Sequence, residues 1–205
     1  MTLRLLIGST NAGKIHEYRA LLRGLDLVLV SPDELASPPQ EPPEDASTYL
    51  ENAVTKATAY ARAAGLPTVA DDSGLEVAAL GGAPGVRSRR FFGEDASAAD
   101  RNRMLLGLLD GVAERSARFV CVIALARPDG EVETFDGEVR GEIADAPRGA
   151  TGFGYDPLFI VADVGRTMAE LTGAEKNAIS HRGQAAAKLR AALDERRRPS
   201  AGMGH

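Results

Sequence analysis

Hydrophobic residues form short runs along the first third of the chain, and these runs predict strands and helices in alternation. Residues 3–8 are rich in leucine and isoleucine, which is typical of a buried strand, and a similar run at 25–30 predicts a second strand. Between them, apolar residues recur at helical spacing from Ile15 onward. The run LPTVA at 66–70 predicts a third, short strand that ends at two adjacent aspartates. This alternation favours an α/β fold.

A long helix is predicted at 48–64, because Thr48 and Glu51 have the spacing of a capping box. At about 100° per residue, its core-facing stripe is expected to hold Leu50, Val54, Ala57, Ala61 and Ala64. Lys56 falls outside this stripe, on an intermediate edge that it shares with Tyr49, Asn52 and Tyr60. The pattern therefore predicts a helix that buries mostly small apolar side chains.

The second half of the chain predicts a hairpin and further helices, so the sheet is expected to be mixed. Strands at 117–127 and 131–140 flank the turn residues PDG, and the first strand is apolar on both faces, which predicts a central position. Helices are expected at about 97–110, 167–178 and 181–196, the last with Ser180 as its N-cap. We expect one domain over residues 1–196 and a frayed tail at 197–205.

Composition excludes several classes of function. The chain has 205 residues, 44% of them hydrophobic, which suffices for a sizeable core. Its net charge of -5 provides no basic field for nucleic acid or for an acidic membrane, and its apolar runs are too short to cross a bilayer. The single cysteine, Cys121, excludes an internal disulfide and is predicted to be a core thiol. A cytoplasmic protein without nucleic-acid or membrane partners is expected.

Lysine is scarce among the 24 basic residues, and its positions are informative. Only four are lysines, namely Lys14, Lys56, Lys176 and Lys188. An ammonium group is a compact point charge, whereas the guanidinium of arginine is a wide planar fork. The first three lysines lie in segments that carry other candidate functional residues, and Lys188 does not.

The segment GSTNAGK at 8–14 is typical of phosphate binding. Gly8, Gly13 and Lys14 satisfy most of the phosphate-loop pattern, and a predicted strand precedes the segment. Ile15, however, stands where that pattern needs a hydroxyl group for Mg²⁺. A lysine in a turn at the start of a helix attracts phosphate without the full motif. An ordinary strand-to-helix turn is the alternative.

Candidate metal ligands are found in two acidic segments. Asp71 and Asp72 follow an apolar run, and strand alternation would turn only one of them toward a given site. Residues 31–46 hold five prolines and five acids and are predicted to form a loop, in which Glu44 and Asp45 precede the long helix. Carboxylate oxygens suit Mg²⁺. A turn-starting aspartate pair and solvated loop acids are the alternatives.

Two further segments suit a flat ligand. In TGFGYDP at 151–157, glycines flank Phe153, whose ring could stack on a base while Asp156 accepts a hydrogen bond. EKNAISHRG at 175–183 contributes three donors, Lys176, His181 and Arg182. A tight turn with an aromatic plug and a histidine at a helix start are the alternatives. Residues 81–93 form a glycine-rich turn with basic and aromatic residues.

Together these segments resemble the inosine triphosphate pyrophosphatases, also called the Ham1-like family. The matching segments occur in the family's order over nearly the whole chain, and they are STNAGK, ENAVTKA, ADDSGLEV, GGAPGVRS, GFGYDPLF and EKNAISHRGQA. The resemblance implies an elongated mixed sheet flanked by helices, with a nucleotide cleft between two lobes. It also implies a homodimer and an Mg²⁺-dependent enzyme that cleaves ITP, dITP and XTP to the monophosphate and pyrophosphate.

The resemblance also implies roles for individual residues. Asp72 would accept a proton and bind the metal with Glu44, and Lys56 would reach the phosphates. Substrate contacts are expected from Ser9, Thr10, Asn11, Ala12, Gly13, Lys14, Ser73, Phe153, Gly154, Tyr155, Asp156, Lys176, His181 and Arg182. Two rival hypotheses are a kinase or NTPase of the phosphate-loop type and a nucleotide sensor without turnover.

Overall fold

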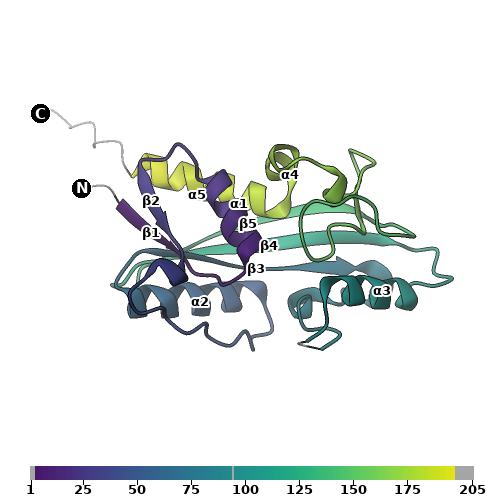
Figure 1. The fold of residues 1–205 in the computed structure, drawn as a ribbon, viewed down its shortest axis with the longest axis horizontal. Coiled ribbons are helices and arrows are strands. Elements are labelled where there is room, and N and C mark those ends of the chain that lie inside the picture. The colour runs from purple at the N-terminus through teal and green to yellow at the C-terminus, as the bar shows by residue number, and fades with distance from the viewer. Residues whose placement is uncertain (1–2, 94, 197–205) are drawn as a thin grey trace, which may run out of the picture.

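A six-stranded mixed sheet forms the centre of the computed structural model, which describes residues 3–93 and 95–196 (Figure 1). The strands follow the order β2-β1-β3-β4-β5-β6 across the sheet. They are β1 (Leu3–Ile7), β2 (Leu27–Val30), β3 (Thr68–Val77), β4 (Ser116–Ala126), β5 (Val132–Ile143) and β6 (Phe159–Val161). β1 pairs in parallel with β2 and β3, and the remaining neighbours are antiparallel. The predicted mixed sheet and the central position of the 117–127 strand are confirmed.

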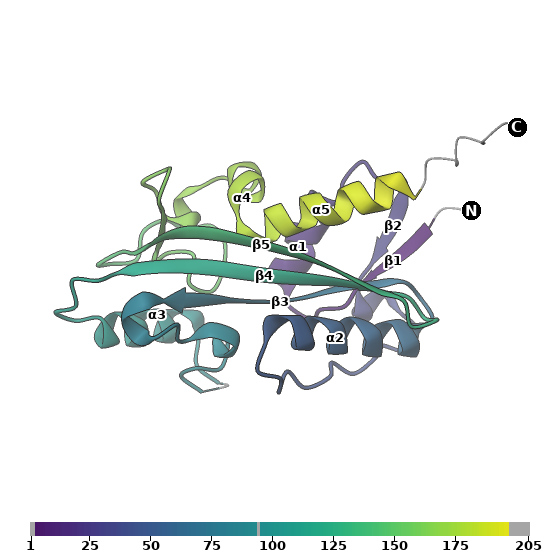
Figure 2. The same ribbon diagram turned by 180° about the vertical axis from the view of Figure 1, so that it is seen from behind.

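Helices cover both faces of this elongated sheet. They are α1 (Ala12–Leu21), α2 (Tyr49–Ala64), α3 (Ala98–Leu108), α4 (Gly173–Ile179) and α5 (His181–Glu195). α2 and α3 lie on one side of the sheet, and α1, α4 and α5 lie on the other, as both views show (Figures 1 and 2). Within the residues that the structure describes, none of the helices has the length and apolarity needed to traverse a membrane.

Side-chain caps start the helices where the sequence predicts them. The Thr48 hydroxyl accepts a hydrogen bond from the Glu51 amide at 3.1 Å, and the Ser180 hydroxyl accepts one from the Gly183 amide at 3.1 Å. Each bond satisfies one of the free amides of a first helical turn. The predicted N-caps of α2 and α5 are therefore confirmed.

Alternation along β3 assigns its residues to two different cores. Ala70 packs against Ala53, Ala57 and Ala61 of α2, in a cluster of small side chains. Val69 belongs instead to the cluster that includes Tyr18 of α1 and Leu189 of α5. Because side chains of a strand alternate in direction, Asp71 follows Val69 toward α1 and α5, while Asp72 follows Ala70 toward α2.

Several predicted boundaries are wrong, for physical reasons. The strand predicted at 66–70 extends to Val77, because β4 pairs with it along its whole length through the two aspartates. Helix α4 starts later than 167, because residues 168–170 form a 3-10 turn. The short strand β6 was not predicted. The predicted loop at 31–46 contains only one 3-10 turn at its start, and the predicted frayed tail lies outside the described residues.

The predicted core stripe of α2 is also rotated from its real position. Leu50 is 48% exposed, whereas Asn52 and Lys56 are each only 2% exposed. The hydrophobic pattern places leucine inside, but the helix turns its edge with Asn52 and Lys56 toward β3 instead. Burial of an amide and an ammonium group requires polar partners, and these partners lie in the cleft described below.

Candidate active site

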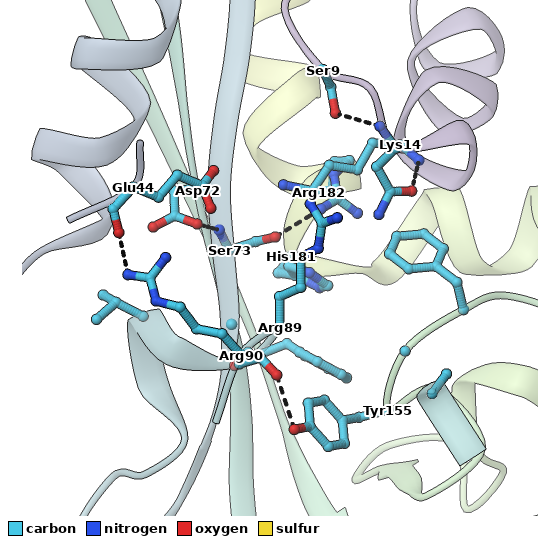
Figure 3. A pocket seen from close by; sticks show the side chains of 18 of the residues that line it. Ser9, Lys14, Glu44, Asp72, Ser73, Arg89, Arg90, Tyr155, His181 and Arg182 are labelled. Carbon is cyan, nitrogen blue, oxygen red and sulfur yellow. Dashed lines mark hydrogen bonds between the residues drawn. The ribbon is translucent and has the colours of Figure 1, made fainter. Parts of the chain in front are cut away.

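A cleft of about 500 Å³ lies beside β3, where the pairing between β1 and β3 ends. β1 pairs with β3 only at Thr68 and Val69, so the next residues of β3 have a free edge on this side. The turn after β1, the acidic loop before α2, the segment after β3 and the start of α5 surround this edge (Figure 3). The cleft therefore forms because β3 continues beyond the end of its pairing with β1.

Most of the residues singled out in the sequence line this one cleft. They are Ser9, Asn11, Lys14, Glu44, Lys56, Asp72, Ser73, Phe153, Gly154, Tyr155, Asp156, Lys176, His181 and Arg182. Thr10, Ala12 and Gly13 do not line it. Thr10 donates its hydroxyl hydrogen to Glu41, and a side chain at Gly13 would collide with the Phe153 ring. Their predicted substrate contacts remain predictions.

The turn between β1 and α1 presents hydroxyl, amide and ammonium groups to the cleft. The Asn11 side chain accepts hydrogen bonds from the amides of Gly13 and Lys14, at 2.9 and 3.2 Å. These two amides are thus satisfied by the cap and are not free to bind an anion. The attraction of this turn for phosphate therefore depends mainly on the Lys14 ammonium group.

Asp71 is fully buried on the α1 and α5 side of β3 and joins two cations. Its carboxylate lies 3.0 Å from the Lys14 ammonium and 3.0 Å from the Arg182 guanidinium. Burial alone would raise the pKa of Asp71, but Arg182, Lys14 and Lys56 outweigh it and hold that pKa well below its ordinary value. Asp71 therefore remains ionised and fixes the positions of two side chains that line the cleft.

Glu17 extends the ion pairs of Asp71 toward the end of the cleft that holds Phe153 and Lys176. Its carboxylate lies 2.6 Å from Arg182 and 2.8 Å from Lys176, which also pairs with Asp156. Burial opposes ionisation of Glu17, but the two cations lower its pKa below the ordinary value. The sequence analysis missed this residue. Its spacing of one helical turn from Lys14 could have indicated that it lies on the same face of α1.

Asp72 lies on the opposite side of β3 and has no cationic partner among the residues described. It accepts hydrogen bonds from the Asn52 side-chain amide at 2.9 Å and from the Ser73 backbone amide at 2.8 Å. Burial raises its pKa, and the negative charge of Glu44 raises it further. Glu44 itself pairs with Lys56. Two carboxylates and two lysines, Lys14 and Lys56, therefore share this end of the cleft.

The donor set at Glu44 and Asp72 fits a divalent cation such as Mg²⁺. Glu44 raises the proton affinity of Asp72, and a shared cation would stabilise both carboxylates. Mg²⁺ usually takes only one or two protein carboxylates, with waters and phosphates as its other ligands. No group of three or more His, Cys, Asp or Glu side chains able to hold a metal occurs in residues 3–93 and 95–196. An all-protein metal cage is therefore absent from that part of the chain.

The other end of the cleft combines an aromatic ring with cations. The Lys176 ammonium lies 4.7 Å and the Arg182 guanidinium 5.6 Å from the centre of the Phe153 ring. His181 stacks on Phe119 with 4.8 Å between ring centres. Burial, together with Arg182 and Lys176, lowers the pKa of His181 well below its ordinary value, so the imidazole is neutral. This end offers donors and a flat apolar surface.

Three arginines that line the cleft were not predicted as site residues, although the basic segment at 81–93 was noted. Arg90 donates to the backbone carbonyl of Glu44, and Arg101 donates to that of Ala96. Arg89 is exposed and projects over the cleft (Figure 3). In the described part of the chain, it is the only lysine or arginine of the cleft without a hydrogen-bond or ion-pair acceptor.

Comparison with known proteins gives consistent matches over nearly the whole chain. The model of the Ham1 family matches residues 5–192. A protein of Geobacter sulfurreducens named dITP/XTP pyrophosphatase is 50% identical over 189 residues, covering 91% of this chain and 94% of its own. A protein of the same name from Thermus thermophilus is 46% identical, covering 94% of this chain and 91% of its own.

Solved structures agree with this match. A HAM1 protein from Coxiella burnetii superposes with a TM-score of 0.85 at 44% identity, covering 94% of this chain and 99% of its own. The Ham1 protein of Staphylococcus aureus superposes with a TM-score of 0.83 at 42% identity, covering 95% of this chain and 100% of its own.

Proposed function

Because the chain belongs to the Ham1 family, we propose that it hydrolyses the deaminated purine nucleotides dITP, XTP and ITP to nucleoside monophosphate and pyrophosphate. The reaction would remove these nucleotides from the nucleotide pool. The observation that carries the proposal is the placement of Asp72, which faces Glu44 and lies beside Lys14 and Lys56 in one cleft. A triphosphate needs such local cations in a chain whose net charge is -5.

In the proposed reaction a water molecule attacks the α-phosphorus, and the bond between that phosphorus and the oxygen bridging to the β-phosphate breaks. Asp72 orients the water and takes its proton. Lys14 and Lys56 neutralise charge on the phosphates. Mg²⁺ held by Glu44 and Asp72 would supply further neutralisation of the developing charge. Pyrophosphate leaves as the second product.

Selection of the base is proposed for the end of the cleft at Phe153. Hypoxanthine and xanthine carry an oxo acceptor at the position where adenine carries an amino donor. Lys176 and Arg182 are donors only, so they could donate to the oxo group, whereas the amino group of adenine would oppose them. The neutral imidazole of His181 can donate through one of its ring nitrogens as well.

Product analysis tests this function directly. The purified protein is incubated with dITP, XTP, ITP, ATP and GTP, each with and without Mg²⁺, and the products are separated by ion-exchange chromatography. We expect monophosphate and pyrophosphate from the first three in Mg²⁺. Diphosphate and phosphate would instead indicate an NTPase of the phosphate-loop type, and tight binding without product would indicate a sensor.

The resemblance to the family also implies an assembly and a location, which we propose for this chain. It would act as a homodimer in the cytoplasm, where the buried thiol of Cys121 stays reduced. Sedimentation at several protein concentrations would test the dimer.

A further inference from the structure

Asn52 connects the two parts of the chain that carry the candidate metal ligands. Its side chain is 2% exposed and lies on the edge of α2 that faces β3. Its amide nitrogen donates to Asp72 at 2.9 Å, and its carbonyl oxygen accepts from the backbone amide of Ala46 at 3.0 Å. Ala46 lies two residues after Glu44, in the loop that enters α2.

Few other contacts hold this loop. Residues 36–46 belong to no helix or strand, so regular secondary structure does not fix the position of Glu44. Beyond Asn52, its acidic half is held by Thr10 through Glu41, by Lys56 through the Glu44 carboxylate and by Arg90 through the Glu44 carbonyl. Thr10 and Lys56 are candidate phosphate contacts, so among the hydrogen bonds of the described residues those with Asn52 and Arg90 hold the acidic half of the loop without a predicted phosphate contact.

An asparagine suits this place because its amide group offers a donor and an acceptor at once. An aspartate could accept from Ala46 but could not donate to an ionised Asp72. An apolar side chain would leave both partners unsatisfied in a buried setting. Each hydrogen bond constrains a different element, one in the sheet and one in the loop.

We propose that Asn52 is a positioning residue that sets the separation of the Glu44 and Asp72 carboxylates, with Arg90 holding the loop at the Glu44 carbonyl. This inference rests on the proposed function, because the separation matters only if the two carboxylates share a metal. Partners that orient metal ligands typically contribute about 10- to 100-fold to metal affinity or activity. Asn52 is not a catalytic residue, since it acts through Asp72 and the loop.

The test uses Mn²⁺ as a spectroscopic substitute for Mg²⁺. Binding of Mn²⁺ to the nucleotide-free protein is followed by electron paramagnetic resonance for the wild type, Asn52→Ala, Arg90→Ala and Thr55→Ala. Thr55 lies on the exposed face of the same helix and serves as the control. The kcat and KM for dITP and the unfolding midpoints are measured for the same proteins.

We expect Asn52→Ala to weaken Mn²⁺ binding about tenfold or more and to lower kcat more than it changes KM. Arg90→Ala should give a smaller change in the same direction, because it leaves the bond from Asn52 to Asp72 intact. Thr55→Ala should behave as the wild type. If Asn52→Ala does not fold, Asn52→Ser is measured in its place, because the serine side chain is too short to contact both Asp72 and Ala46.

A folded Asn52 variant with Mn²⁺ affinity and kcat within about twofold of the wild type would overturn the inference, because loss of a partner that orients a metal ligand has a larger effect than that. A lower unfolding midpoint with unchanged Mn²⁺ binding would reduce Asn52 to a structural residue and would also overturn it. Failure of the wild type to release pyrophosphate would instead refute the proposed function, while the Mn²⁺ comparison would still be valid.

Discussion

Adjacent aspartates on β3 have opposite environments, although the sequence presents them as a pair. Asp71 is 0% exposed and lies between Lys14 and Arg182, which hold its pKa well below the ordinary value. Asp72 is 4% exposed and forms no ion pair among the described residues, and burial and the negative charge of Glu44 raise its pKa in spite of the hydrogen bond from Asn52 and the charges of Lys14 and Lys56. The Asp71 carboxylate stabilises two cations, whereas the Asp72 carboxylate would be stabilised by binding a proton or a cation.

This difference separates a structural charge from the charge that we propose to be catalytic on a single strand. A buried carboxylate with two cationic partners is part of the framework, and removing it leaves buried cations uncompensated. A buried carboxylate without a cation costs stability and is retained where it has a function. Substitution of Asp71 should therefore change mainly the free energy of unfolding, and substitution of Asp72 should change mainly the turnover of dITP.

Asp72→Asn is expected to have the largest effect, and the effect should be on activity. Turnover of dITP should fall by about 1,000-fold or more, because the proposed base and metal ligand is lost while the shape is kept. Since its raised pKa shows that folding disfavours the ionised form of Asp72, the neutral variant should not lower the free energy of unfolding. Steady-state kinetics and urea denaturation measure the two quantities, and turnover within tenfold of the wild type would contradict the assignment.

Asp71→Asn should have its main effect on stability. Removing one partner of a buried ion pair typically costs about 3–5 kcal/mol, and Asp71 serves two cations at once. The free energy of unfolding from urea denaturation is compared with that of Asp136→Asn, which removes an exposed carboxylate paired with Lys188. Equal losses in the two variants would show that the buried network adds no more than a surface pair.

Lys56→Ala tests whether the ammonium group on the α2 side of β3 contributes to catalysis on the triphosphate. The lysine is 2% exposed and lies beside Glu44, so its loss should weaken catalysis on a triphosphate about 100-fold. Lys188→Ala is the matched control, because Lys188 is 54% exposed and pairs with a surface aspartate. The kcat/KM for dITP measures both, and similar values for the two variants would refute the argument from lysine scarcity.

Glu17→Gln should have the smallest effect, which should depend on pH. The pKa of Glu17 is lowered by folding, so its charge stabilises the fold at pH values above about 4.5, its pKa in the unfolded chain. This stabilisation is lost as the pH falls through the lower pKa of the folded protein. At neutral pH the variant should lose about 2 kcal/mol, less than Asp71→Asn, because Lys176 keeps Asp156 and Arg182 keeps Asp71 as carboxylate partners. Urea denaturation at pH 7 and pH 4 should show this gap narrowing, and a constant gap would exclude the charge as its cause.

The sequence by itself determined the elements whose signals are local. Capping residues start α2 and α5 as predicted, the PDG turn joins β4 to β5, and continuous apolar residues place β4 in the centre of the sheet. Local chemistry also identified the segments that meet in the cleft, because lysines, paired acids and glycine-flanked aromatics stand out in composition.

Only the tertiary structure decided which of these residues face one another. The extent of β3 depends on pairing with β4, so the predicted strand ended too early, and this pairing is what continues the alternation through Asp71 and Asp72 that the sequence predicted only conditionally. Glu17 and Asn52 are an ordinary helical glutamate and asparagine until α1 and α2 pack against the sheet and bring them to buried partners. Hydrophobic periodicity placed Leu50 inside, yet the helix buries Asn52 and Lys56, because their hydrogen bonds and ion pairs form only in the folded molecule.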